Sequence, residues 1–202
     1  MDVDAKLWGE RREAFYRRML RDLETGYFDV ELYPLISTLF RIETLFPTSS
    51  CAGRIVILEA KVPWRKDEVR ILYKKHTPIT KEEFLNVISK SGDNVWFIVQ
   101  PPILHISCLN IETAAKLLNI ARESGFKHSG IISVSKRGYH VELRGNEVFT
   151  VPIKINGILL LNMDNAEHLV EEANRVLLDS KVRIERLHNN IKRSFTLDIS
   201  RN

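Results

Sequence analysis

The sequence of 202 residues predicts an α+β fold, not an alternating α/β fold. Apolar segments of strand type come in pairs, and helical segments flank these pairs instead of separating every strand from the next. The chain contains no Gly-x-Gly-x-x-Gly segment and no P-loop, so a Rossmann nucleotide site is not expected. Hydrophobic residues make up 44% of the chain and charged residues 28%, which is typical of a globular domain.

Helical periodicity and capping residues predict five helices. The first spans residues 4–25, with Asp4 as its N-cap and Gly26 after its end. Pro34 fits the first turn of a second helix, which continues to about residue 45. The remaining helices are expected over residues 80–90, 111–124 and 165–193. Capping boxes mark the beginnings of the first and last of these three.

Short runs of β-branched and aromatic residues predict the strands, with hairpin turns at Lys136-Arg137-Gly138 and Asn156-Gly157. A helix, a segment of small or polar residues and two strands occur twice, which suggests an internal duplication of residues 34–110 and 111–193 within one domain of residues 1–202. The two halves share little sequence, so an unduplicated domain remains the alternative. The predicted strands are residues 54–61, 69–75, 95–99, 103–109, 131–135, 139–143, 148–153 and 158–161.

Composition and charge narrow the class of protein. The net charge of +4 permits a polyanionic partner without requiring one. Two cysteines, Cys51 and Cys108, allow at most one disulfide, and no His/Cys cluster has the spacing of a metal site. No apolar run reaches the ~18 residues of a membrane span, and the acidic N-terminus has no apolar signal core. We therefore expect a cytoplasmic protein that uses no metal and no membrane.

The segment from Pro47 to Arg54 is the most informative part of the chain. Its central residues are all small, and they include three hydroxyls and one thiol. We expect a loop here, between the helix that precedes it and a buried strand. Such a loop lets a flat or polar ligand come close to the backbone. The alternative is a Ser/Thr-rich turn in which Gly53 supplies an unusual backbone angle, and composition alone does not separate the two.

Isolated side chains offer further candidates, each with a structural alternative. His105 lies in an apolar strand, where it is either a core residue or a proton acceptor, and His76 stands at a strand end. Trp64 has basic neighbours and either anchors its loop or stacks on a nucleobase. The basic end of the last helix suits either the helix dipole or a surface that contacts phosphates.

Several motifs, in order, resemble those of the tRNA wyosine/wybutosine-synthesis N(4)-methyltransferases. The likeness covers about residues 5–195. The matching segments are Thr48-Ser49-Ser50-Cys51-Ala52-Gly53-Arg54-Ile55, the Pro101, Leu104-His105 and Cys108 strand, Ser124 to Ile131, Lys136-Arg137-Gly138, Val151-Pro152, and Arg183-Ile184-Glu185-Arg186.

The resemblance implies a function, a cofactor and a fold. Members of the family transfer a methyl group from S-adenosyl-L-methionine to a ring nitrogen of a tricyclic guanosine derivative beside the anticodon of tRNA(Phe). Wyosine-type bases belong to archaea and eukaryotes. The implied fold has two strand-helix repeats that share a single barrel-like mixed sheet flanked by helices.

The resemblance also implies roles for residues, and we expect the segment that ends at Arg54 to form one cleft with the His105 strand. Ser49 and Ser50 would hold the base or the donor, and His105 or His76 would accept a proton. The donor site would include Thr48, Cys51, Gly53, Arg54, Ser129 and Gly130. The tRNA would contact Lys136, Arg137, Arg183, Arg186 and Trp64.

This chain departs from the family pattern at three positions. Gln100 stands where the pattern has Glu, Pro102 where it has an aromatic residue, and Lys75 where archaeal relatives often have Trp. This chain therefore has no carboxylate at position 100 that could act as a base or contact the donor. The competing functions are a non-catalytic tRNA-binding module, which would not bind the methyl donor, and an interaction scaffold, which would bind neither donor nor RNA.

Overall fold

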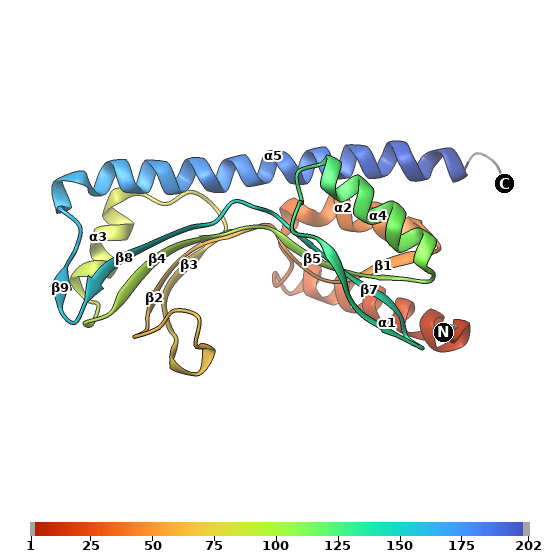
Figure 1. Cartoon of the computed structure of the whole chain (residues 1–202), viewed down its shortest axis with the longest axis horizontal. Helices are drawn as coiled ribbons and strands as arrows, with labels where there is room; N and C mark the ends of the chain where they lie inside the picture. Colours follow the sequence, from red (N-terminus) through yellow and green to blue (C-terminus); the bar gives the residue numbers. More distant parts are fainter. Residues whose placement is uncertain (1–2, 200–202) are drawn as a thin grey trace. The chain divides into compact units, whose positions relative to one another are not determined.

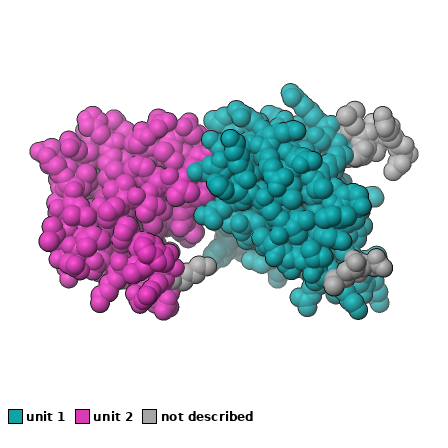
Figure 2. All heavy atoms as spheres, in the orientation of Figure 1, with its two compact units in different colours: residues 1–52, 102–146, 182–202 teal, residues 53–101, 147–181 magenta. Residues whose placement is uncertain are grey.

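The computed structural model describes residues 3–199, and the chain forms two compact units, each with its own sheet (Figures 1 and 2). Unit 1 comprises Met1–Ala52, Pro102–Asn146 and Val182–Asn202, and unit 2 comprises Gly53–Pro101 and Glu147–Lys181. All strand pairs formed by the described residues are antiparallel. Helices and antiparallel sheets together confirm the α+β prediction.

Unit 1 contains a 4-stranded sheet in the order β1-β5-β7-β6. Figure 1 shows α1 on one side of this sheet and α2 and α4 on the other. The elements of unit 1 are α1 (Ala5–Glu24), a short 3-10 helix (Val30–Leu32), α2 (Tyr33–Arg41), β1 (Leu45–Cys51), β5 (Ile103–Cys108), α4 (Ile111–Glu123), β6 (Gly130–Ser135) and β7 (Gly138–Arg144).

Unit 2 contains a 5-stranded sheet in the order β3-β2-β4-β8-β9. The long helix α5 (Ala166–Ile199) contributes residues up to Lys181 to unit 2 and residues from Val182 to unit 1. The other elements of unit 2 are β2 (Arg54–Glu59), a 3-10 turn (Lys66–Glu68), β3 (Arg70–Lys75), α3 (Lys81–Ser89), β4 (Val95–Gln100), β8 (Phe149–Ile155), β9 (Ile158–Leu159) and a 3-10 turn (Met163–Asn165).

The expected single barrel-like mixed sheet is wrong, because the strands form two separate sheets with antiparallel pairing. The ladders are interrupted where the chain passes from one unit to the other. Gly53 has φ of 87° between β1 and β2, and Pro101-Pro102 lies between β4 and β5. A positive φ ends an extended run, and proline donates no hydrogen bond to a ladder. The internal duplication of residues 34–110 and 111–193 stays a prediction.

The segment that we expected to be a loop is an edge strand. The helix before it ends at Arg41, not near residue 45, and Leu45–Cys51 pairs with Ile103–Cys108. Proline has a low preference for strands, but Pro47 is tolerated on this edge strand, where hydrogen bonds to β5 fix the backbone. The prediction of a loop was therefore wrong for the residues up to Cys51.

Local turn and capping signals were more reliable. The Asp4 carboxylate caps α1 by accepting from the Leu7 amide at 3.0 Å, and Thr80 begins α3 with a complete capping box. Asn156 and Gly157 have φ of 49° and 78°, as the predicted hairpin between β8 and β9 requires. No helix in residues 3–199 is long and apolar enough to cross a membrane.

Candidate active site in unit 1

The His105 network consists of three side chains on neighbouring strands of unit 1. The Ser49 hydroxyl on β1 lies 2.7 Å from Nδ1 of His105 on β5. Nε2 of His105 lies 2.9 Å from the Glu142 carboxylate on β7. Ser49 and Glu142 are the direct cross-strand neighbours of His105, so the three side chains share one face of the sheet.

The chemistry of these groups fixes the proton positions in the neutral network. A carboxylate can only accept a hydrogen bond, so Nε2 of His105 carries the hydrogen and donates it to Glu142. Nδ1 of the neutral ring then has a free electron pair, and it accepts the hydrogen bond from Ser49. The network therefore runs from a hydroxyl through an imidazole to a carboxylate, and the hydroxyl is its outer end.

A bulge in β1 brings Ser49 into this position. The register of β1 against β5 shifts between Pro47 and Ser49, which leaves Thr48 as the extra residue. The Thr48 hydroxyl donates to the main-chain oxygen of His105 at 3.2 Å and ties the bulge to β5. Bulges commonly redirect a side chain beside a functional site, and this one places the serine opposite the histidine.

A cavity of about 190 Å³ adjoins the network through Ser49. Its lining combines aromatic rings, one arginine, two carboxylates and four hydroxyls. The lining residues are Phe15, Arg18, Met19, Asp22, Tyr27, Phe28, Asp29, Ile36, Phe40, Pro47, Thr48, Ser49 and Ser50. A cavity lined by aromatic rings together with convergent polar groups is a common form of small-molecule site.

Asp29 links the cavity to the end of β1. One of its carboxylate oxygens accepts a hydrogen bond from the Ala52 amide at 3.1 Å. Ala52 itself is fully buried, so this contact holds the last residues of the small-residue segment against the chain between α1 and α2. Cys51 and Cys108 form no disulfide, and burial raises the pKa of Cys108 to about 12, which keeps that thiol protonated.

The structure brings together part of the predicted site. Thr48, Ser49 and Ser50 line the cavity, and Ser49 contacts His105. The segment's residues in β1 thus lie against the His105 strand, but no residue of β5 lines this cavity, so the cleft that we expected the two segments to share stays a prediction. Cys51, the last residue of that strand, is half-buried and pairs in the ladder with Ile103.

The other predicted residues of unit 1 do not line the cavity. The Ser129 hydroxyl donates to the Phe126 carbonyl at 2.7 Å, and Gly130 begins β6 opposite Glu142. Lys136 and Arg137 are exposed in the turn between β6 and β7, and Arg186 is exposed on α5. Arg183 is half-buried and donates to the Gly125 carbonyl, so part of its guanidinium binds the end of α4.

Four predicted residues belong to unit 2. Gly53 and Arg54 begin that unit, and Nε of Arg54 donates to the side-chain oxygen of Gln100 at 2.6 Å. His76 directly follows β3, and Trp64 is 77% exposed in the connection between β2 and β3. The amide at position 100 thus supplies the acceptor for Arg54 in this chain.

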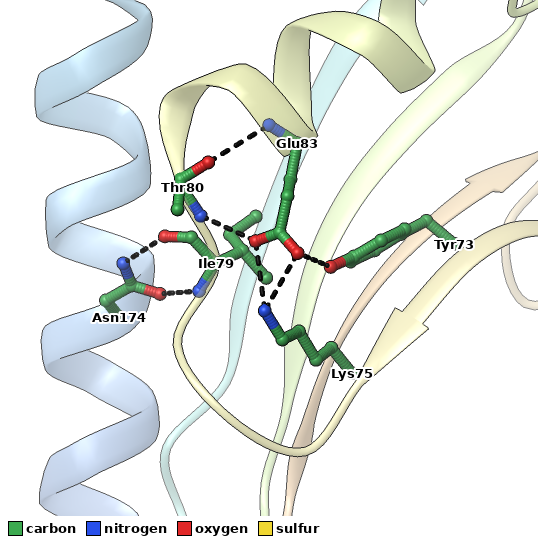
Figure 3. A network of polar contacts seen from close by, with 6 residues as sticks. All are labelled: Tyr73, Lys75, Ile79, Thr80, Glu83 and Asn174. Atoms are coloured by element: carbon green, nitrogen blue, oxygen red, sulfur yellow. Dashed lines mark hydrogen bonds and ion pairs between the residues drawn. The ribbon is translucent and has the colours of Figure 1, made fainter.

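A second polar cluster, the Glu83 network, lies in unit 2 (Figure 3). Glu83 accepts hydrogen bonds from the Lys75 ammonium at 2.8 Å, the Tyr73 hydroxyl at 2.9 Å and the Thr80 amide at 2.8 Å. The hydrogen bond from Lys75, followed by those from Thr80 and Tyr73, lowers the pKa of Glu83 to about 2. This carboxylate stays ionised and joins β3 to the beginning of α3.

Sequence reasoning missed two site residues, Glu142 and Asp29. Alternation along β7 puts Val141 and Leu143 on the buried face and Glu142 on the polar face, which was visible in the sequence. The sequence did not show that Glu142 lies beside His105, because this contact depends on the pairing of β5 with β7. Asp29 follows α1 without any distinguishing pattern. No group of three or more His, Cys, Asp or Glu in the described residues could hold a metal ion.

Comparison with known proteins identifies the family. The family model described as Methyltransferase TYW3 matches residues 10–193. The chain belongs to this family. The resemblance indicated by the sequence motifs is confirmed, and the matched region contains the whole His105 network and every residue that lines the cavity.

Similar proteins come from archaea. A relative from Saccharolobus solfataricus is 36% identical over 183 residues, which cover 90% of this chain and 88% of the relative. A relative from Aeropyrum pernix is 32% identical over 168 residues, which cover 83% of this chain and 89% of the relative. Both relatives are named tRNA(Phe) 7-((3-amino-3-carboxypropyl)-4-demethylwyosine(37)-N(4))-methyltransferase.

Solved structures of the same fold cover most of the chain. The PH1069 protein from Pyrococcus horikoshii has a TM-score of 0.86 and 32% identity, and the match covers 92% of this chain and 96% of that one. A hypothetical protein from Aeropyrum pernix has a TM-score of 0.75 and 30% identity, with 80% of this chain and 96% of that one covered.

Proposed function

We propose that this protein transfers a methyl group from S-adenosylmethionine to N(4) of 7-(3-amino-3-carboxypropyl)-4-demethylwyosine at position 37 of tRNA(Phe). The reaction is a step in the formation of wybutosine-type bases. Family membership and the names of the relatives support this proposal. The observation that carries it to this chain's own residues is the His105 network, whose outer hydroxyl lies in the wall of a cavity.

The side chains that line the cavity would suit this methyl donor. The rings of Phe15, Phe28 and Phe40 suit an adenine base. The carboxylates of Asp22 and Asp29 suit ribose hydroxyls or an ammonium group, and Arg18 suits a carboxylate. When bound, the donor supplies a methyl group on a positively charged sulfur. Ser50 and Thr48 would hold its polar groups, and Cys51, Gly53, Arg54, Ser129 and Gly130 remain candidates for further contacts.

The His105 network would remove the proton that the base nitrogen loses on methylation. That proton passes to the Ser49 oxygen, and the hydroxyl proton of Ser49 passes to Nδ1 of His105. The ring becomes an imidazolium, and Glu142 stabilises its positive charge through the hydrogen bond at Nε2. Ser49 and Glu142 hold the ring from both sides, so the proton transfer requires no rearrangement of the ring. His76 stays a second candidate for the proton acceptor.

The tRNA would bind through basic and aromatic side chains. Lys136, Arg137 and Arg186 are exposed and would contact phosphates, while Trp64 would stack on a base. Arg183 would contribute the part of its guanidinium that does not bind Gly125. These contacts would add affinity that falls with salt concentration.

The test is mass spectrometry of the anticodon loop. The tRNA that carries the demethylated base is incubated with the protein and the donor, and the base fragment should gain one methyl group. Ser49→Ala should slow this gain by about tenfold or more, because the proton relay is broken. Ser37→Ala is the matched control, since the Ser37 hydroxyl donates only to Pro34 within α2.

Two results would contradict the proposal. If the wild-type protein binds the tRNA and adds no methyl group, the non-catalytic binding module is the correct function. If Ser49→Ala methylates as fast as Ser37→Ala, the His105 network has no part in the reaction.

A further inference from the structure

A cluster of basic side chains lies next to the His105 network in unit 1. Nη1 of Arg11, on α1, donates to the main-chain oxygen of Arg137 at 3.0 Å. Arg137 lies in the turn between β6 and β7, and His140 follows it on β7. His140 is two residues before Glu142, so both side chains lie on the same face of the sheet as His105.

The guanidinium of Arg11 is held in place before any ligand binds. Its central carbon lies 5.7 Å from the centre of the Phe15 ring and 6.0 Å from that of Phe46. The main-chain amide of Asp4 also donates a hydrogen bond to the main-chain oxygen of Lys136 at 3.0 Å, which holds the beginning of α1 against the same turn. Little side-chain entropy therefore remains to be lost when Arg11 binds a partner.

The positive charge of this cluster is not balanced by carboxylates. In residues 3–199, no ion pair joins Arg11, Arg137 or His140 to Asp or Glu, and Glu142 is hydrogen-bonded to His105. Burial, and after it the charge of Arg137, lowers the pKa of Arg11. Burial, followed by the charges of Arg11, Arg137 and His105, lowers the pKa of His140. The cluster is thus a place where an anion would relieve repulsion.

The position of the cluster relates it to the proposed reaction. Phe15, which packs under Arg11, also lines the cavity, and the His105 network lies on the same face of the sheet. An anion bound by Arg11 and Arg137 would belong to a molecule that reaches the network. The planar guanidinium fork matches both phosphate and carboxylate.

We infer that Arg11, Arg137 and His140 form an anion-binding subsite for the RNA substrate. The anion is a backbone phosphate of the anticodon loop or the carboxylate of the base's 3-amino-3-carboxypropyl chain. Arg11 and Arg137 supply the charge, and the imidazole of His140 donates one hydrogen bond. This inference rests on the proposed function, and it assigns to Arg11 and His140 a role that the sequence did not indicate.

The experiment compares Arg137→Gln and Arg11→Gln in the full chain. Arg137 is exposed and offers α1 only its main-chain oxygen, so its substitution leaves that contact intact. Arg17→Gln is the matched control, because Arg17 is on the same helix, its side chain is 74% exposed, and its partner is Glu13. The readouts are the Kd, in the absence of the methyl donor, for an anticodon stem-loop that carries the aminocarboxypropyl base, kcat/KM for tRNA, and the Kd for S-adenosylhomocysteine.

Both test variants should weaken stem-loop binding about 10- to 100-fold, which is the effect of losing a hydrogen bond to a charged group. Arg17→Gln should leave it unchanged. The source of the anion is identified by measuring the Kd for a second tRNA, which carries 4-demethylwyosine without the aminocarboxypropyl chain. If the anion is a phosphate, each variant binds both tRNAs more weakly by the same factor, and the slope of log affinity against log salt concentration falls by about one. If the anion is the carboxylate, each variant binds more weakly only to the tRNA whose base carries the aminocarboxypropyl chain.

The inference is overturned if both variants bind each tRNA as Arg17→Gln does. It is also overturned if their affinity for S-adenosylhomocysteine falls while tRNA affinity is unchanged, because the cluster then binds the donor's carboxylate. Failure of the proposed function is distinguishable, since it would appear as absent methyl transfer by the wild-type protein. The stem-loop Kd values would still decide whether the subsite exists.

Discussion

The two units each contain a polar network that involves strands, and the networks differ in how completely they are satisfied. In unit 2, Glu83 accepts hydrogen bonds from Lys75, Tyr73 and the Thr80 amide, so its oxygens are occupied by partners on the same unit (Figure 3). In unit 1, the His105 network ends at the Ser49 hydroxyl in the wall of a cavity. A hydroxyl oxygen has two acceptor sites, so Ser49 can receive a proton from a ligand while it donates to His105.

This difference separates a stabilising network from a reactive one. The Glu83 network joins a strand to the beginning of a helix, and its carboxylate, with a pKa of about 2, stays ionised near neutral pH. The His105 network contains an imidazole, which is the side chain best suited to proton transfer near neutral pH. Substitutions in the two networks should therefore affect different measurements, activity for unit 1 and stability for unit 2.

The largest expected effect is that of His105→Ala. Loss of the proton acceptor should lower the rate of methyl transfer by about 10²-fold or more, while the thermal unfolding temperature changes little. The rate is measured by mass spectrometry of the anticodon fragment. His168→Ala is the matched control, because the His168 side chain is 83% exposed on α5. A loss of less than threefold would remove His105 from the proton-transfer role.

Glu142→Gln should have a smaller effect on the same reaction. The amide can still accept the hydrogen bond from Nε2 of His105, but it no longer balances the charge of an imidazolium. We expect a loss of about tenfold in kcat, with little change in the Kd for tRNA. Equal kcat values for the variant and the wild type would show that His105 does not become charged during the reaction.

In unit 2, Thr80→Ala should lower stability and leave activity unchanged. The variant loses the hydroxyl that accepts from the Glu83 amide at 3.2 Å, and helix N-caps typically contribute about 1 kcal/mol. The free energy of unfolding in urea should fall by that amount, and methyl transfer at 25 °C should remain at the wild-type rate. A loss of activity without a loss of stability would break the proposed separation between the two networks.

The smallest effect is a dependence of stability on acid pH. The pKa of Glu83 falls from an ordinary value of 4.5 to about 2 in the folded chain, so the unfolded chain binds more protons between these values. The contribution of Glu83 is therefore fully present above about pH 4.5 and is lost as the pH falls towards 2. Urea midpoints of the wild type should fall more steeply across this range than those of Glu83→Gln. Parallel curves for the two proteins would contradict the assignment.

The sequence predicted a good part of the fold and of the site, and its failures have a common cause. It predicted the caps of α1 and α3, the hairpin at Asn156-Gly157 and the family, and it selected His105 together with Ser49. The capping box expected at the beginning of the last helix was wrong, because Asp164 lies inside the 3-10 turn that precedes α5. It misread the backbone of Leu45–Cys51, because that strand is stabilised by hydrogen bonds to β5 and not by its own residues. It also missed Glu142, which is 37 residues from His105 in the chain.

The single sheet expected from the family resemblance failed for a related reason. Gly53 and Pro101-Pro102 were visible in the sequence, but whether they bend a continuous sheet or separate two sheets depends on which strands pair on either side. The roles assigned to His76, Arg54 and Trp64 depend on the same kind of information. They remain predictions about unit 2.

By itself, the sequence determined where helices begin, where the chain turns, which faces are apolar and which family the chain resembles. These properties arise from contacts between residues a few positions apart, or from motifs that survive in the linear order. Only the tertiary structure decided that β1, β5 and β7 are adjacent and in the register that aligns Ser49, His105 and Glu142. A shift of one residue in either register would turn these side chains to opposite faces, so the candidate active site is a consequence of strand pairing.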